Sequence, residues 1–260
     1  MMNPEIIRFA AVGIVILLSH CMEGITGFGC SVLALPFLAM LLGLKTAVPV
    51  LVVLGWVLSG YIILRSLKTI RWKEFFFIAI HVGLGLPAGI LLFERLPAWC
   101  LTVLLALFMI GVGVQGIWKT YRGRNIAPPQ TQSDSGVKQN RTILMRAVLF
   151  CGGIIHGAFG SGGPFVVIYA SRALPEKSLF RVTLSLLWFT LNSALIVQWT
   201  WSGGIWNPGI RNAVLIASPF LIAGMLLGDY LHHRVNEYFF KMIVYTVLFL
   251  AGLLTAYSIV

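Results

Sequence analysis

Ten apolar stretches run along the chain, separated by short polar or glycine-rich segments. They lie at about 6–22, 30–44, 46–64, 74–93, 98–118, 143–156, 162–174, 179–200, 211–230 and 237–258. A helix needs about 20 residues to cross the apolar core of a bilayer, so most of these stretches predict membrane-spanning helices. The first stretch lacks a preceding basic segment and a small-residue cleavage site, so we interpret it as a membrane helix and not as a removed signal peptide.

Four stretches are short, and they form two pairs: 6–22 with 30–44, and 143–156 with 162–174. Each pair is joined by a glycine-rich connector, E-G-I-T-G-F-G in the first case and H-G-A-F-G-S-G-G in the second. Lipid offers no water to irregular backbone, so such a break survives only when it is buried in protein or lines a wet cavity. We therefore predict two broken helix hairpins, whose second helices begin near Cys30 and near Gly163 and Pro164.

A polar linker at 119–141 divides the chain into two halves, 1–118 and 142–260. At an offset of 133 residues, three glycines of the first half fall on three of the second: Gly24, Gly27 and Gly29 on Gly157, Gly160 and Gly162. At an offset of 135, the segment A-G-I-L-L-F-E-R-L at 88–96 falls on A-G-M-L-L-G-D-Y-L at 223–231. The two matches keep the same order, which predicts an internal repeat.

The composition excludes an ordinary soluble domain. Hydrophobic residues make up 58% of the 260 residues and charged residues 10%, and the mean hydropathy is +0.92, whereas a soluble domain carries roughly 25% charged residues. Together with the pattern, this predicts an all-α integral membrane protein of 8 to 10 helical segments, in which each repeat is a broken hairpin followed by three transmembrane helices. The net charge of +11 lies almost entirely in loops, so it reflects membrane topology and not nucleic-acid binding.

The loop charges favour inverted repeats. If each hairpin returns to its starting side, one side of the membrane carries fifteen Lys and Arg, and the other carries only Arg8, Lys45, Arg95 and Arg211. If each broken pair is instead a single crossing, the division is twelve against seven. Positive loops stay in the cytoplasm, so we predict an inner (cytoplasmic) membrane protein with both termini outside and the linker inside.

The two breaks are the predicted binding site. The first N–H groups of a helix have no intrahelical partner and carry partial positive charge, which suits an anion. The alternative is that the glycines only allow close helix packing. The candidate substrate-binding residues at the breaks are Thr26, Gly27, Gly29, Cys30, Ser31, Gly160, Ser161, Gly162 and Gly163.

The segments E-G-I-T-G-F-G-C-S-V-L-A-L-P-F-L-A-M-L-L-G-L at 23–44 and G-G-I-I-H-G-A-F-G-S-G-G-P at 152–164 resemble the TauE/SafE family of sulfite exporters. The resemblance implies movement of sulfite or small organosulfur anions such as sulfonates, with proton coupling as a driving force. It maps the family's motif glycines onto the glycines of both breaks. The chain departs from the motif in having Cys30 where a glycine is usual, and Glu23 and His156 match no motif position.

Ionisable groups at membrane depth are expensive and suggest function. Glu23 and His156 occupy equivalent positions at the two breaks, and His20 lies one turn before Glu23. All three are proton-coupling candidates, because an ionised Glu23 would repel an anion that a protonated one tolerates. The competing interpretation is that Glu23 and His156 cap the broken helices or pair with each other.

Other polar residues have two interpretations each. Arg181 and Lys45 begin long helices and could face the anion path or anchor the interface. Asn192 could contact a ligand or bond to a neighbouring helix, as could Ser193. The Cys30 thiol could contact a sulfur anion, although a buried thiol is more often inert. The tryptophans Trp56 and Trp188 could line the cavity or pack.

We therefore expect a secondary transporter working by alternating access, whose partners are a small anion, protons and the lipid bilayer. A passive anion channel or uniporter is the alternative, and a membrane-embedded enzyme is a remote one because no catalytic motif and no P-loop is present. No metal site, cofactor or nucleic acid is expected. A homo-oligomer remains open, because the sequence carries no oligomerisation signal.

Overall fold

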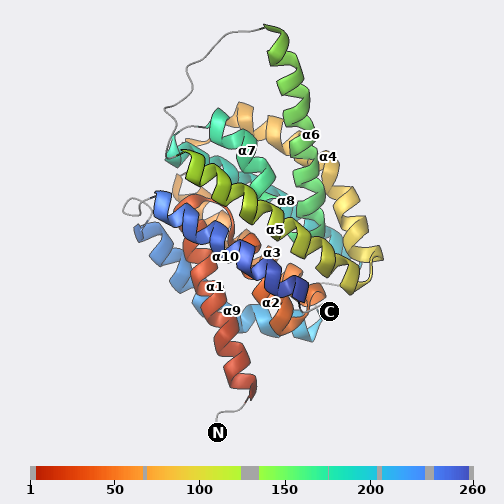
Figure 1. Cartoon of the computed structure of the whole chain (residues 1–260). Helices are drawn as coiled ribbons and strands as arrows, with labels where there is room; N and C mark the ends of the chain where they lie inside the picture. Colours follow the sequence, from red (N-terminus) through yellow and green to blue (C-terminus); the bar gives the residue numbers. More distant parts are fainter. Residues whose placement is uncertain are drawn as a thin grey trace.

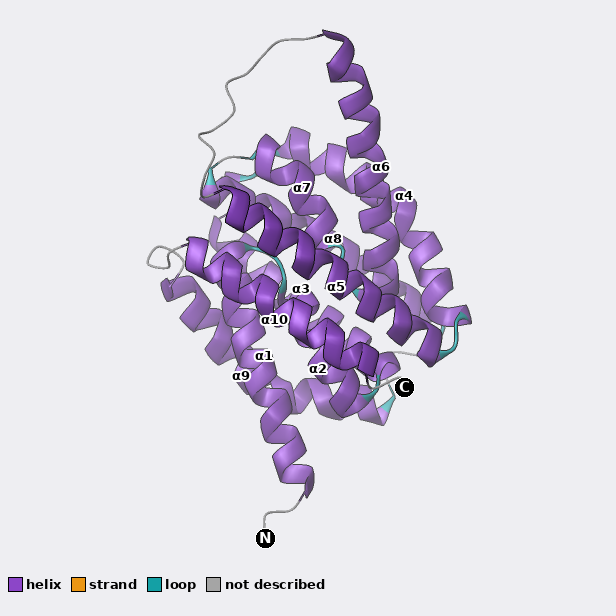
Figure 2. Ribbon diagram, viewed as in Figure 1, coloured by secondary structure: helices purple, strands orange, loops and turns teal. Residues whose placement is uncertain are grey.

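A computed structural model describes residues 4–66, 69–123, 135–174, 176–203, 207–231 and 237–257. The ten helices of this part of the chain are α1 (Pro4–Thr26), α2 (Cys30–Leu42), α3 (Leu44–Ser66), α4 (Trp72–Arg95), α5 (Ala98–Gly123), α6 (Ser135–Phe159), α7 (Gly163–Ala173), α8 (Lys177–Trp201), α9 (Pro208–Leu231) and α10 (Glu237–Tyr257). They form one bundle (Figures 1 and 2). Each apolar stretch corresponds to a helix, so the all-α prediction is confirmed.

Six helices are long and apolar enough to cross a membrane. They are the apolar parts of α1, α3, α4, α5, α8 and α9, at Ile7–Thr26, Leu44–Ser66, Trp72–Arg95, Ala98–Arg122, Lys177–Trp201 and Pro208–Leu231. The prediction of four short helices is wrong for two of them, since α1 has 23 residues and α6 has 25. Polar residues that sequence hydropathy discounts extend both helices, and only α2 and α7 are short.

The predicted linker at 119–141 is partly helical. The helix α5 continues to Gly123, and α6 begins at Ser135. Residues 124–134 lie outside the described part of the chain, as do three of the cations that predict the topology, Lys68, Arg124 and Arg234.

The centre of the bundle is the pair α3 and α8, which pack against each other. In the most apolar segment of each helix, 67% of the residues are buried in α3 and 56% in α8, compared with 22% in α9. Around this pair, α1 packs along α9 and α4 packs along α6. In the repeat register α1 corresponds to α6 and α9 to α4, so the two outer pairings are equivalent. The helices α1 and α6 begin at opposite ends of the bundle (Figure 1), as an inverted repeat predicts.

Glycines set the spacing of both outer helix pairs. A Cβ on Gly153 of α6 would lie 2.0 Å from the Val82 carbonyl oxygen of α4, and one on Gly157 would lie 2.4 Å from that of Leu86. In the equivalent pair, a Cβ on Gly24 would lie 3.0 Å from the Gly228 Cα. Any side chain at these positions would push the helices apart. The packing interpretation therefore describes the first glycine of each motif, Gly24 and Gly157.

Candidate functional site

The first break is a short turn that glycine backbone makes possible. Gly27 and Gly29 have φ values of 81° and 103°, and α2 begins at the next residue, Cys30. The Thr26 hydroxyl lies 2.9 Å from the Met22 carbonyl oxygen and 2.7 Å from that of Phe28. This hydroxyl therefore closes the end of α1 and is turned toward backbone.

Glu23 caps the helix that follows the first break. Its Oε2 accepts a hydrogen bond from the backbone N–H of Cys30 at 3.0 Å, and the residue is 4% exposed. The bond fills one of the donor positions that the start of α2 would otherwise leave without a partner. The capping interpretation thus describes Glu23 in this conformation, and a carboxyl group lies where the sequence predicts an anion.

The second break repeats the turn without an acid. Gly160 has a φ of 62°, and α7 begins at Gly163 with Pro164 in its first turn. A proline there loses no helical hydrogen bond. The Ser161 hydroxyl donates to the Phe159 carbonyl oxygen at 3.1 Å. Both predicted helix starts are confirmed.

His156 points sideways to α8 instead of capping α7. Its Nε2 lies 3.1 Å from Asn192 Oδ1, and its ring stacks on Trp188 with centroids 5.4 Å apart. An amide oxygen only accepts, so Nε2 donates, and in a neutral ring Nδ1 is left as an acceptor. Nδ1 is buried and has no hydrogen-bond partner among the described residues.

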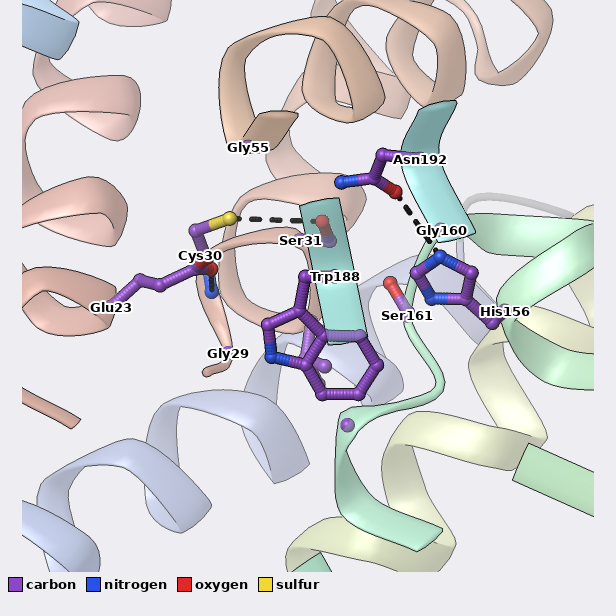
Figure 3. A pocket seen from close by; sticks show the side chains of 12 residues that line it. Glu23, Gly29, Cys30, Ser31, Gly55, His156, Gly160, Ser161, Trp188 and Asn192 are labelled. Atoms are coloured by element: carbon purple, nitrogen blue, oxygen red, sulfur yellow. Dashed lines mark hydrogen bonds between the residues drawn. The ribbon is translucent and has the colours of Figure 1, made fainter. Parts of the chain in front are cut away.

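The two breaks meet around one small cavity (Figure 3). It is lined by Glu23, Gly29, Cys30, Ser31, Val32, Gly55, His156, Gly160, Ser161, Gly163, Trp188 and Asn192. Its free volume is about 20 Å³, counted as the space open to the centre of a water-sized sphere. A single water molecule needs roughly 10–15 Å³ by the same measure, so the cavity has room for about one water. A sulfur oxyanion therefore requires the walls to move apart.

Trp188 connects the two breaks. Its Nε1 donates to the Gly27 carbonyl oxygen at 3.0 Å, while the face of its indole ring lies on His156. Figure 3 shows the indole between the Glu23 and Cys30 side and the His156 and Ser161 side of the cavity. Of the two tryptophans that could line the cavity, Trp188 does so, whereas Trp56 donates to Ser193 at 2.8 Å.

Five of the predicted site residues do not line this cavity: His20, Thr26, Gly27, Gly162 and Arg181. Gly27 and Gly162 shape the turns, since a Cβ on Gly27 would lie 2.6 Å from the Arg181 Cα and one on Gly162 would lie 2.4 Å from the Gly152 carbonyl oxygen. His20 Nδ1 lies 2.9 Å from the Ile16 carbonyl oxygen, and Nε2 has no partner among the described residues. His20, a proton-coupling candidate because it lies one turn before Glu23, therefore makes no hydrogen bond to Glu23 in this conformation.

The two cations that could face the anion path, Arg181 and Lys45, are engaged with other groups. Arg181 Nη2 lies 2.9 Å from Asp229 Oδ1, and Arg65 Nη1 lies 2.9 Å from Oδ2 of the same aspartate. Lys45 donates to the Phe93 carbonyl oxygen and lies over the Phe93 ring. No lysine or arginine lines the cavity among the described residues, so its polar lining is one carboxyl group and neutral donors and acceptors.

Two lining residues were not predicted. Gly55 lies within an unbroken apolar stretch, and its missing side chain leaves room between Cys30 and Asn192, whose atoms lie 3.7 Å and 3.5 Å from a Cβ built there. Val32 lies one residue beyond the predicted serine. No polar or periodic signal distinguishes either residue in the sequence, because the contact depends on how α3 packs beside α2.

A family model described as "Sulfite exporter TauE/SafE" matches residues 12–255, nearly the whole chain and both breaks. No curated protein and no solved structure matches the chain. The resemblance indicated by the glycine motifs is therefore confirmed by a match that extends far beyond them.

Proposed function

The chain belongs to the sulfite exporter TauE/SafE family, and we propose that this membrane transporter carries sulfite or a small sulfonate through the cavity between its two breaks. The observation that carries the proposal is the convergence of two helix N-termini on one buried cavity. Ser31 and Ser161 add a hydroxyl from each break. Such N-termini bind anions without any cation, because their free N–H groups and the helix dipole favour negative charge.

Transport occurs by alternating access between two inverted repeats, 1–118 and 142–260, joined by the cytoplasmic linker 119–141. The support for the inversion is the opposite starting ends of α1 and α6, together with the equivalent pairings of α1 with α9 and of α6 with α4. The start of α1 and the end of α10 share one end of the bundle, while the end of α5 and the start of α6 share the other (Figure 1). With the excess of cations on the linker side, this supports external termini.

The transport cycle is coupled to protons through Glu23. As an ionised carboxylate, Glu23 holds the Cys30 N–H that an incoming anion would use, and it repels that anion at short range. When Glu23 takes up a proton, the repulsion is removed and the N–H becomes available. A bound anion and an ionised Glu23 therefore exclude each other, and this exclusion links anion movement to proton movement.

The test is uptake of radiolabelled sulfite into liposomes that contain the purified protein, with and without an imposed pH gradient. We expect accumulation above the level set by the sulfite gradient, and loss of that accumulation when the proton gradient is collapsed. Isethionate, taurine, sulfate and acetate serve as competitors. Uptake that is limited by the sulfite gradient and indifferent to pH would identify a channel or uniporter and contradict coupling. If sulfite does not move but a sulfonate does, the carrier stands and its substrate changes.

A further inference from the structure

The charge balance of the cavity defines which anions it takes. Glu23 is the one acidic group among the lining residues, and no basic side chain compensates it there. The compensation comes from the starts of α2 and α7, which both open onto the cavity. Each helix N-terminus is equivalent to about +0.5 elementary charge, so the two together offset about one negative charge.

The opposite ends of the broken helices contribute little negative charge at this place. At the end of α1, Thr26 and Gly27 do not line the cavity. The Gly27 carbonyl oxygen accepts from Trp188, and the Gly27 N–H donates to the Glu23 carbonyl oxygen at 2.7 Å. At the end of α6, the Gly160 N–H donates to the His156 carbonyl oxygen at 2.7 Å. The positive ends therefore dominate the field inside the cavity.

A second observation points to a ligand. His156 is 2% exposed, and its Nδ1 has no hydrogen-bond partner among the described residues. Figure 3 shows this ring nitrogen on the side of the ring that faces Ser161 and the cavity. A buried polar atom without a partner is costly. A ligand O–H would satisfy it, since the bond from Nε2 to Asn192 leaves Nδ1 as an acceptor in the neutral ring.

From this balance we infer that the cavity holds one negative charge at a time, and that its substrate is a singly charged sulfur oxyanion. This inference rests on the proposed function and specifies the substrate class of the same site. The empty cavity holds the Glu23 carboxylate on the Cys30 N–H, and the loaded cavity holds a monoanion beside a neutral Glu23. Hydrogen sulfite fits best, because its O–H donates to His156 Nδ1 while its other oxygens accept from the helix starts. Sulfonates fit by charge alone, and sulfite and sulfate dianions carry one charge too many.

Methanesulfonate and sulfate provide a matched test. Both are tetrahedral at sulfur and similar in size, and they differ by one charge at neutral pH. We would measure the binding of each to the purified protein by calorimetry, and their inhibition of radiolabelled sulfite uptake into liposomes at fixed ionic strength. One surplus charge at contact distance in protein surroundings is worth tenfold or more in affinity, so sulfate should bind and inhibit at least about tenfold more weakly.

Two variants at His156 test the charge count itself. His156→Lys adds a positive charge while retaining a donor for Asn192, and we expect it to narrow or reverse the preference for methanesulfonate. His156→Gln adds none, and the preference should persist. Equal or tighter binding of sulfate by the wild-type protein, with sulfite uptake intact, would overturn the inference and leave the transporter standing. Absence of sulfite uptake together with absence of binding by either anion would overturn both.

Discussion

At the first break a carboxyl group reaches forward to the helix that follows, whereas at the second break a histidine reaches sideways to a neighbouring helix. Glu23 and His156 occupy equivalent positions in the repeat, yet Glu23 bonds to the Cys30 N–H and His156 bonds to Asn192. The backbone device is the same in both halves: a positive-φ glycine after a long helix, then a new helix start. The two breaks therefore share a backbone turn, and they differ in the side chain that stands at the end of the preceding helix.

The hairpins also differ in how they are held. The helix α2 packs along α1, α3 and α10, whereas α7 packs along α6 and more lightly against α4. Tyr169 of α7 donates to Glu74 of α4 at 2.6 Å, and Phe165 of α7 stacks on Phe108 of α5 with centroids 5.9 Å apart. The short helix α2 is therefore built into the core around α3, whereas the short helix α7 is held outside its own hairpin mainly by individual side chains.

Substituting the glycine at each break gives the largest contrast. In Gly27→Ala the new Cβ would lie 2.6 Å from the Arg181 Cα, a backbone atom that cannot yield, at a φ of 81°. In Gly160→Ala the nearest atom is the Val52 side chain, at 2.9 Å and a φ of 62°. We expect the free energy of unfolding to fall by about 3 kcal/mol or more in Gly27→Ala and by about 1–2 kcal/mol in Gly160→Ala.

Thermal unfolding in detergent measures these losses, and Gly43→Ala is the control. Gly43 also has a positive φ, of 77°, but nothing lies within 4 Å of a Cβ built there, so only the backbone strain of about 1 kcal/mol should remain. A Gly27→Ala variant as stable as Gly43→Ala would show that the first break is not held against α8.

The acid and the histidine should separate coupling from binding. Glu23→Gln keeps an oxygen for the Cys30 N–H but removes the ionisable group, so concentrative sulfite uptake driven by a pH gradient should fall about tenfold or more while exchange of internal for external sulfite persists. His156→Gln should weaken binding by up to about tenfold, the scale of one hydrogen bond, and keep the dependence on the gradient. Gradient-driven uptake that survives Glu23→Gln would remove Glu23 from the coupling.

Trp188 connects the two breaks, and Trp199 offers a matched control. Trp188→Phe keeps an aromatic ring and loses the hydrogen bond to the Gly27 carbonyl oxygen. The lost bond should lower the free energy of unfolding by about 1 kcal/mol, in addition to the effect of the smaller ring. Trp199 is buried to a similar extent, and its Nε1 has no hydrogen-bond partner among the described residues. Thermal unfolding in detergent should therefore show a lower stability for Trp188→Phe than for Trp199→Phe, and the reverse order would contradict a bridging role.

The smallest effects are expected at the two ends of the central helix pair. Arg65 pairs with Asp229 at one end, and Gln198 donates to Glu94 at 2.6 Å at the other. These pairs correspond in the repeat, at offsets of 133 and 135. Because the Arg65 side chain is 62% exposed, Arg65→Ala should cost at most about 1 kcal/mol, and less at high salt. Gln198→Ala should show no salt dependence of its own in the same unfolding series.

Much of the fold follows from the sequence, because apolar length and glycine spacing act locally. The starts of α2 at Cys30 and α7 at Gly163 follow directly from the glycine connectors. The lengths of α1 and α6 do not, because both helices continue through polar residues that a hydropathy pattern excludes from an apolar stretch. The inverted orientation remains a prediction from charge counting, supported by the directions of α1 and α6.

The candidate site is predictable only in part. The sequence identifies Gly29, Gly160, Gly163, Ser31, Ser161 and Asn192 as candidates, and these line one cavity, whereas the candidates Gly27 and Gly162 do not. It cannot tell which way a side chain turns. Arg181 reaches Asp229, a partner that lies on another helix, α9, and the Thr26 hydroxyl turns to local backbone at the end of α1. Gly55 contributes by lacking a side chain, a role visible only once α3 lies beside α2.

If both breaks bind one anion, Trp188, which contacts both, is the residue best placed to report it. Fluorine NMR of protein labelled with 5-fluorotryptophan, with the Trp188 resonance assigned through Trp188→Phe, would be followed during a sulfite titration. We predict a saturable shift of the Trp188 resonance, while the resonance of Trp201, which is 89% exposed, stays in place. Saturable binding that moves other resonances and leaves Trp188 unchanged would show that the anion binds elsewhere.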